Sequence, residues 1–324
     1  SGTNGGTTAS CGAGKVVVAP VVVTPTVNGG TAKLASLAAS LQPGQWTILN
    51  NDGDASGYNW NLLVACTAPN NSGDCGDTII NYADKGLWDP NTKEIHFLGA
   101  GHLRAWKFVT YSASTDKWIR QPKPYFDCRE TESLCWPMGH GYEHSTINPE
   151  NGDIYWRGFS SSEMYRWTKA TGTWAPLESS SNPNPTIVGA LAYFPEMGGL
   201  LFIGGGKVHF FNETTNTWSQ LASNLPMAEY HNVATYDPIN KIVIFGGGNN
   251  SPKLHKINAA GVITAIADAP AAVGVNSSVF TVDPARGKFL LFTWAGSFHE
   301  YNVTTHTRSN LNPASVPIRN TGAQ

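Results

Sequence analysis

The chain has 324 residues and carries 21 Lys and Arg against 23 Asp and Glu, a formal net charge of −2. Proteins that bind nucleic acid by neutralising phosphates normally carry an excess of basic residues, so this balance excludes that class of partner. Only 14 % of the residues are charged, whereas there are 34 Gly, 20 Pro and 11 Trp. Such a composition is typical of a strand-rich protein with many turns. The longest aliphatic run, 16–23, is too short to cross a bilayer and contains Pro20, so we expect no membrane span.

The first 45 residues predict two short segments that precede the main domain. Residues 1–31 are rich in Gly, Thr and Val and are expected to form a flexible leader. No basic region precedes an apolar stretch, so we expect that any signal peptide has been removed. Residues 32–45 begin with leucines three and four positions apart. That spacing predicts one short amphipathic helix and a lead-in to the next strand.

An acidic stretch follows, Asp52-Gly-Asp54-Ala-Ser56-Gly57. Oxygen donors at alternate positions resemble the first half of a calcium loop, which makes Asp52 and Asp54 candidate calcium ligands. Leu63 stands where such a loop needs a bidentate Glu. A solvated Asp/Gly turn is therefore the alternative interpretation, and calcium is kept as a candidate cofactor.

Four of the five cysteines form two local pairs. Cys66 and Cys75 enclose one polar loop, and Cys128 and Cys135 enclose a second. Disulfides that close such loops are typical of secreted or cell-surface proteins, so we expect both pairs to be oxidised. Spacing does not fix connectivity, and five reduced thiols in a cytosolic protein are the alternative. Cys11 would be left without a partner.

Five segments of the chain repeat one pattern. Each has an apolar strand, a turn with Pro, a second apolar strand that usually ends near Gly, a third aromatic strand and a closing strand. The turn prolines, 43 to 59 residues apart, are Pro90, Pro149, Pro195, Pro238 and Pro284. Three of the closing strands carry a Trp, at Trp118, Trp174 and Trp218.

A repeat of this length with four short strands predicts a β-propeller over residues 46–324. Runs such as Ile242-Val-Ile-Phe are apolar on both faces, so each sheet must be covered by its neighbours. Five blades are readable, and we expect five to seven in the full ring. A β-sandwich with coincidental spacing is the alternative, and it would have to explain five matched turns.

The repeats resemble those of kelch-type propellers, the superfamily that includes the central domain of galactose oxidase. The match lies in Leu201-Phe-Ile-Gly-Gly-Gly, in Tyr230-His231 before Asp237-Pro238, and in Ile244-Phe-Gly-Gly-Gly. It covers residues 77–312. The resemblance implies a propeller fold and leaves the activity open, because such folds host enzymes and binding proteins alike.

Propellers carry function on the loops that lead into the innermost strands. Two such stretches contain Tyr and His, which can exchange protons with a substrate, and one departure from the repeat places an Arg where Gly is usual. This set matches what propeller polysaccharide lyases use on uronic acids. The alternative is that these side chains satisfy backbone groups near the channel. The candidate catalytic residues are His140, Tyr142, His144, Arg157, Tyr230 and His231.

A second group of residues is a candidate for binding sugar rings: His102, Arg104, Trp106 and Trp136. A further resemblance, to copper-radical oxidases, would make Tyr142, Tyr230 and His231 copper ligands. Residues 83–88 contain no cysteine for that family's Tyr–Cys cross-link, and we expect no appended domain to supply another His. The ligand set is thus incomplete.

The sequence favours a secreted kelch-like propeller that recognises an extracellular polymer, with a polysaccharide as the expected partner. A polysaccharide lyase using Tyr and His is the first alternative. A structural or adhesion module of a larger surface protein is the second.

Overall fold

The computed structural model describes residues 33–42, 45, 85–99, 107–122, 141–158, 163–177, 183, 189–274, 277–293 and 295–311. The chain divides into two units, 1–30 and 31–324, and all described residues belong to the second. The predicted leader and the stretch that follows the helix, 46–84, lie outside the described residues.

Twenty strands among the described residues form five four-stranded antiparallel sheets, blades 1 to 5 in chain order. Blade 1 contains β1 (Leu87–Asp89), β2 (Glu94–Gly99), β3 (Lys107–Ser112) and β4 (Lys117–Arg120). Blade 2 contains β5 (Ser145–Ile147), β6 (Ile154–Arg157), β7 (Met164–Thr168) and β8 (Thr173–Pro176). Blade 3 contains β9 (Ala190–Phe194), β10 (Gly199–Gly204), β11 (Lys207–Asn212) and β12 (Thr217–Ala222). Blade 4 contains β13 (Asn232–Asp237), β14 (Ile242–Gly247), β15 (Leu254–Asn258) and β16 (Ile263–Ala265), and blade 5 contains β17 (Ser278–Asp283), β18 (Lys288–Thr293), β19 (Phe298–Asn302) and β20 (Thr307–Asn310).

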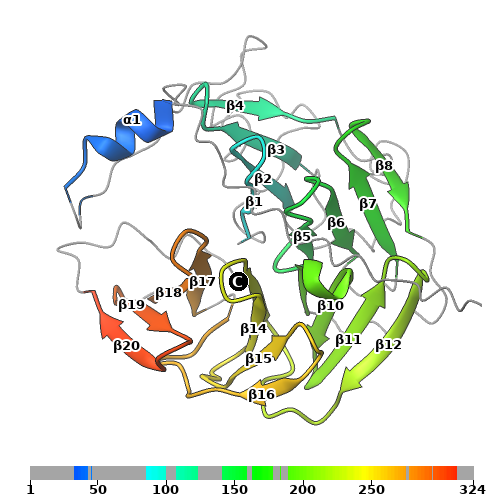
Figure 1. Ribbon diagram of the computed structural model, residues 1–324, viewed down its shortest axis with the longest axis vertical. Coiled ribbons are helices and arrows are strands. Elements are labelled where there is room, and N and C mark those ends of the chain that lie inside the picture. The colour runs from blue at the N-terminus through cyan, green and yellow to red at the C-terminus, as the bar shows by residue number, and fades with distance from the viewer. Residues whose placement is uncertain are drawn as a thin grey trace, which may run out of the picture. The chain divides into compact units, whose positions relative to one another are not determined.

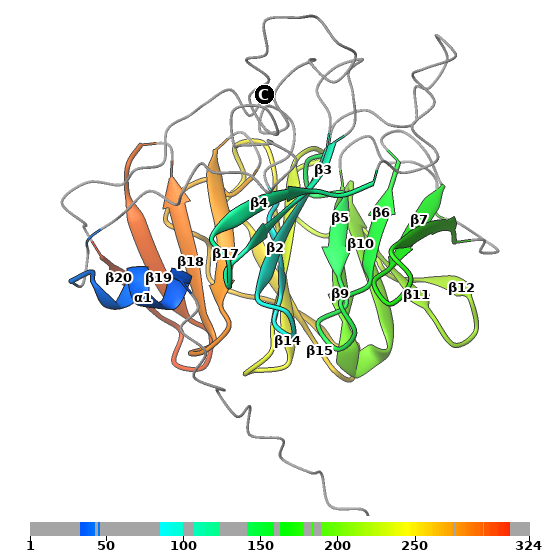
Figure 2. The same cartoon turned by 90° about the horizontal axis from the view of Figure 1, so that it is seen from above.

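The blades stand around a common axis as a β-propeller (Figure 1). The first strand of each blade is innermost and the fourth outermost, and the first strands of successive blades contact one another from β1 to β17. Figure 2 shows the strands running roughly along the axis. The predicted all-β propeller is therefore confirmed, with five blades in the described part of the chain. The predicted short helix is α1 (Lys33–Ala39), whose Leu34 N–H donates to the Ala113 carbonyl at 3.3 Å.

The five predicted turn prolines all lie between the first and second strands of their blades. In four blades an Asp or Asn side chain before the proline accepts a hydrogen bond from the backbone N–H two residues on, a local turn that needs no tertiary contact. These residues are Asp89, Asn148, Asp237 and Asp283, with distances of 2.7 to 2.9 Å. Blade 3 uses a short 3₁₀ helix, Pro195–Met197, at the same place.

The core of the described part is divided among the interfaces between blades. Four apolar clusters lie between blades 1 and 2, 2 and 3, 3 and 4, and 4 and 5. The interface of blades 3 and 4, for example, buries Phe194, Leu201, Val243 and Phe245 completely. Each sheet is thus stabilised mainly by apolar surface that its neighbours remove from water.

The three predicted tryptophans occupy equivalent places, each the second residue of a fourth strand. Each is paired across the sheet with an aromatic residue of the third strand: Tyr111 with Trp118, Trp167 with Trp174, and Phe211 with Trp218. Trp118 and Trp218 are buried as expected, whereas Trp174 is only half-buried. In blade 5, Arg308 takes the Trp position, and its guanidinium lies 5.5 Å from the centre of the Tyr301 ring.

A glycine at the end of the second strand of blade 4 allows a close approach of the backbone. Gly247 has a φ of 62°, and a Cβ there would lie 2.0 Å from the Val273 carbonyl oxygen. Any side chain at this position would therefore collide with the backbone that leads to blade 5.

Candidate functional site

The residues just before each innermost strand gather at one end of the ring, which we call the channel entrance. Residues 85–86 precede β1, 141–144 precede β5, 228–231 precede β13 and 277 precedes β17. Two of these stretches are those in which the sequence predicted functional Tyr and His residues. Their predicted position, leading into innermost strands, is correct.

Four aromatic side chains meet at the channel entrance, and we call them the aromatic cluster: Tyr142, His144, Tyr230 and His231. The ring centres of Tyr142 and His231 lie 5.2 Å apart with an edge-to-face angle of 66°. His144 lies 6.4 Å from Tyr142, and Tyr230 lies 6.3 Å from His231. Tyr142 leads into blade 2 and His231 into blade 4, so their contact bridges blades that are not neighbours. Such a contact is possible only close to the axis.

Two members of the aromatic cluster have unusual backbones. Tyr142 has a φ of 31° and His231 a φ of 64°. Non-glycine residues in this left-handed region cost on the order of 1–3 kcal/mol and concentrate at functional sites. Both strained residues are also the two whose rings touch across the axis. The strained backbones therefore hold the two rings in contact.

The polar groups of the aromatic cluster differ in their access to solvent. Nδ1 of His231 lies 2.5 Å from Oδ1 of Asn249, a contact that orients the imidazole. Nδ1 of His144 lies 3.1 Å from the Arg157 carbonyl oxygen and is buried. Tyr230 is 39 % exposed, so its ring presents an apolar face and a hydroxyl to solvent.

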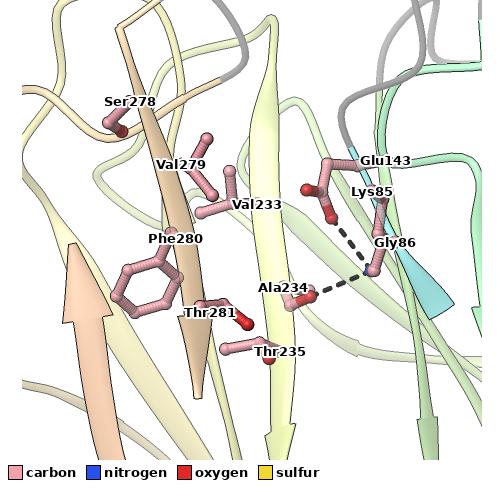
Figure 3. Close-up of a pocket in the computed structure, with 10 residues that line it drawn as sticks. All are labelled: Lys85, Gly86, Glu143, Val233, Ala234, Thr235, Ser278, Val279, Phe280 and Thr281. Atoms are coloured by element: carbon pink, nitrogen blue, oxygen red, sulfur yellow. Dashed lines mark hydrogen bonds and ion pairs between the residues drawn. The ribbon is translucent and has the colours of Figure 1, made fainter. Parts of the chain in front are cut away.

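A small cavity of about 100 Å³ lies inside the channel, below the entrance (Figure 3). Lys85 and Glu143 form one wall, and residues 233–235 of β13 and 278–281 of β17 form the opposite side. The Lys85 ammonium lies 2.9 Å from Oε2 of Glu143 and donates to the carbonyl oxygens of Leu191 and Ala234 at 2.7 and 3.0 Å. One side chain thus bonds to groups from blades 2, 3 and 4. Sequence reasoning missed both charged residues. Glu143 could have been found from its place between Tyr142 and His144, whereas no local signal marks Lys85.

The backbone of Arg157 bonds to His144, but its side chain turns between blades 2 and 3. It is completely buried at the end of β6, where Nη2 donates to the Pro183 carbonyl at 2.7 Å and the guanidinium lies 3.9 Å from the centre of the Phe202 ring. Burial lowers the pKa of Arg157 to about 10, so the group stays charged at neutral pH. The structure thus places this guanidinium between blades 2 and 3, held by the protein itself.

The remaining predicted site residues lie outside the described residues. They are His140, His102, Arg104, Trp106 and Trp136, the calcium candidates Asp52 and Asp54, and the cysteines Cys66, Cys75, Cys128 and Cys135.

The residues at the entrance do not fit the copper centre that the oxidase resemblance implies. The structure does bring Tyr142, Tyr230 and His231 together. However, the sequence has no cysteine between residues 83 and 88 to form the cross-link, and Tyr142 is buried against His231. We derive no chemistry through copper.

Comparisons with known proteins support the fold alone. No protein family and no curated protein matches the chain. Among solved structures, a chain of the nidogen/laminin complex aligns with 74 % of this chain and 83 % of its own length, at 10 % identity and a TM-score of 0.51. Virginiamycin B lyase from Staphylococcus aureus aligns with 74 % of this chain and 72 % of its own at 14 % identity and a TM-score of 0.49. A fungal alcohol oxidase in complex with copper aligns with 73 % of this chain and 54 % of its own at 14 % identity and a TM-score of 0.47. The protein is a β-propeller with five described blades. No helix among the described residues is long and apolar enough to cross a membrane.

Proposed function

We propose that this protein is a propeller that binds carbohydrate at the channel entrance, with an extracellular polysaccharide as its ligand. The observation that carries the proposal is the aromatic cluster on the axis. Tyr230 offers an exposed ring to the apolar face of a sugar, and Asn249 and His231 offer hydrogen-bonding groups beside it. Apolar rings with a few fixed polar groups are the usual composition of a small-molecule site.

The size of the cavity favours a polymer that lies across the entrance. At about 100 Å³ the cavity is well below the roughly 300–1,000 Å³ of sites that enclose a whole ligand. It holds a few waters or one small substituent. A glycan would therefore stack its rings on Tyr230 and His231, the two members of the aromatic cluster that are not buried, and send at most one group toward Glu143 and Lys85.

Binding can be measured by titrating neutral and acidic polysaccharides into the full chain. We expect Tyr230→Ala to weaken binding at least tenfold, because it removes the exposed ring. Ile239→Ala is the matched control, since Ile239 is 55 % exposed on the β13–β14 turn at the other end of the ring. Equal effects of the two substitutions, or no binding of any glycan by the unaltered chain, would contradict the proposal and favour a structural or adhesion module.

A lyase acting on uronic acids is the second candidate, and the strained contact of Tyr142 with His231 favours it. A base would take the proton from the carbon next to the carboxylate, a C=C bond would form as the glycosidic C–O bond breaks, and an acid would protonate the leaving oxygen. Arg157 is held between blades 2 and 3, so another cation would have to neutralise the carboxylate. The absorbance of unsaturated products tests this candidate. Tyr230→Phe and His231→Ala should abolish that absorbance. Binding of the polysaccharide without any rise in absorbance would contradict the lyase and favour the binding function.

We also propose that the blades are of kelch type and that the protein is secreted. The kelch assignment rests on the motifs Leu201-Phe-Ile-Gly-Gly-Gly and Ile244-Phe-Gly-Gly-Gly, which occupy the second strands of blades 3 and 4. Secretion rests on the predicted links Cys66–Cys75 and Cys128–Cys135. Mass spectrometry of unreduced peptides should detect both links, and free thiols at these four positions would remove the argument.

A further inference from the structure

A second group of chemically reactive side chains lies far from the channel entrance. Asp89 is the last residue of β1 and is paired directly with Glu94 of β2, and His96 follows two residues on, on the same face. One potential ligand atom of each residue lies within 4.8 Å of the others. Because β1 runs away from the entrance, this cluster is at the opposite end of the ring. The cluster is therefore separate from the proposed carbohydrate site.

The two carboxylates of this cluster hold a cation that comes from the neighbouring blade. The Lys169 ammonium, on the β7–β8 turn of blade 2, lies 2.6 Å from Oδ2 of Asp89 and 2.9 Å from Oε2 of Glu94. It also lies 2.7 Å from the Thr92 hydroxyl. Burial alone would raise the pKa of Asp89, but the hydrogen bonds from Lys169 and from the Asn91 N–H hold it below its usual value. Both carboxylates are thus satisfied.

His96 is the member of the cluster that Lys169 does not satisfy. The side chain is 1 % exposed, and its Nδ1 lies 2.8 Å from the Thr110 hydroxyl. Its Nε2 is buried, has no hydrogen-bond partner among the described residues and lies 4.0 Å from Oε2 of Glu94. A buried polar atom without a partner costs about 1–3 kcal/mol. The Lys169 ammonium does not relieve this cost. Its three N–H groups already face three oxygens, those of Asp89, Thr92 and Glu94.

A divalent metal ion would satisfy all three side chains at once. One imidazole nitrogen and two carboxylate oxygens, with a fourth position for water, are a ligand set that suits Zn²⁺. The Thr110 hydroxyl, which also accepts a bond from Gln121 at 3.0 Å, holds the His96 ring with Nε2 toward the carboxylates. Such support from a second layer of residues is common behind metal-binding histidines.

Gly152 lies against the position of the cation and leaves space for it. Gly152 adopts a φ of 79°, and a Cβ there would lie 2.8 Å from Oδ2 of Asp89 and 2.7 Å from Cδ of Lys169. Only glycine therefore leaves room at this point for both the carboxylate and the incoming cation. The Lys169 side chain is 20 % exposed and belongs to a surface turn, so it has a path into solvent.

From this geometry we propose that Asp89, Glu94 and His96 form a binding site for a divalent transition metal of the Zn²⁺ class, in which the Lys169 ammonium holds the cation position until the metal displaces it. After the exchange, the two charges of the metal ion balance the two carboxylates of Asp89 and Glu94. It also releases the ion pairs that join blade 1 to blade 2, so metal occupancy and the contact of these blades are linked.

Isothermal titration of Zn²⁺ into the full chain tests the proposal. We expect one zinc per chain at this site, with binding at least tenfold tighter in Lys169→Met, because the competing ammonium is gone. Binding should be at least tenfold weaker in His96→Gln, both alone and combined with Lys169→Met. Glu94→Gln gives a second variant, on a more exposed residue, in case His96→Gln fails to fold. His255→Gln is the matched control, since His255 is also buried with an unpartnered Nδ1 in the described part of the chain but has no acidic cluster around it.

Three outcomes would overturn the proposal. The first is that neither the unaltered chain nor Lys169→Met binds zinc. The second is that His96→Gln and His255→Gln change binding equally, since the metal would then be bound elsewhere. The third is that Lys169→Met alone binds zinc, because the ammonium would then never yield its place in the natural chain.

Discussion

His231 combines a strained backbone with a ring contact across the axis. Its φ of 64° strains the backbone, while its ring contacts Tyr142 across the axis. We expect His231→Gly to raise the free energy of unfolding by about 1 kcal/mol, because glycine adopts this conformation without strain. The same substitution should weaken glycan binding at least tenfold. Urea unfolding and glycan titration measure the two effects.

Lys241→Gly provides the control for this prediction. Lys241 has a similar φ of 54° but lies on the β13–β14 turn, at the far end of the ring. The Lys241→Gly variant should be more stable than the unaltered chain and bind glycan with the same affinity. A clear loss of stability in His231→Gly would mean that the imidazole contributes more to the fold than its backbone strain costs.

His255 gives the fold a sensitivity to acid. The residue is buried in β15, stacked 5.6 Å from the Phe245 ring, and burial lowers its pKa below the usual value of about 6.5. The folded state therefore keeps His255 neutral where the unfolded state binds a proton. Below about pH 6.5 this difference lowers the free energy of unfolding as the pH falls, by at most about 1.4 kcal/mol per pH unit.

We expect His255→Leu to make the stability less dependent on pH in that range. Urea unfolding of both proteins between about pH 7 and pH 5 measures the difference in slope. The unaltered chain should lose more stability than the variant. Parallel pH profiles would show that His255 is protonated equally in the folded and unfolded states.

At the scale of the elements, aromatic pairs tie the fourth strand of a blade to the third. The ring centres of Phe211 and Trp218 lie 5.3 Å apart in blade 3, and those of Tyr111 and Trp118 lie 5.3 Å apart in blade 1. In the part of the chain that the structure describes, each of these outermost strands pairs with one neighbour, so side-chain packing supplements its hydrogen bonds.

We expect Trp218→Ala to lower the free energy of unfolding by about 3–5 kcal/mol, the range for removing a large core aromatic. Trp174→Ala should cost less, because Trp174 stands at the equivalent place but is only half-buried. Denaturant unfolding of both variants gives the comparison. A cost below about 1 kcal/mol for Trp218→Ala would contradict the assignment of this residue to the core between blades.

At the scale of the whole molecule, Lys85 links the blades around the axis. Its ammonium bonds to Glu143 and to carbonyl oxygens of β9 and β13, residues up to 149 positions away in sequence. Among the described strands, β9 and β13 have no neighbouring strand on their inner edges, so these carbonyls need another donor. A single side chain supplies it.

We expect Lys85→Met to lower the free energy of unfolding by about 3–5 kcal/mol, because it leaves the Glu143 carboxylate buried and unpaired. Adding Glu143→Gln should recover part of the loss, since the uncompensated charge is then removed. A double-mutant cycle by urea unfolding measures the coupling between the two residues. Purely additive losses would show that the ion pair does not stabilise the ring.

The local features of this fold were predictable from sequence because they are encoded by neighbouring residues. The turn at Asp237 is made by a side chain and a backbone N–H two positions apart, so the Asp-Pro pair marks it directly. The apolar run of β14 indicates a strand covered on both faces, and its repetition indicates stacked blades. The position of Tyr142 and His231 before innermost strands follows from the same repeat.

The chemistry of both proposed sites was decided by the tertiary structure. Lys169 meets Asp89 across 80 positions of sequence, and Lys85 meets Leu191 across 106. Arg157 broke the repeat and was expected at the entrance, but its guanidinium turns between blades 2 and 3 to cover Phe202. The sequence by itself determined which strands form and where they turn, because those choices depend on residues a few positions apart. Which charged groups meet depended on how the blades pack around the axis, which brings together side chains whose separation in sequence carries no signal of contact.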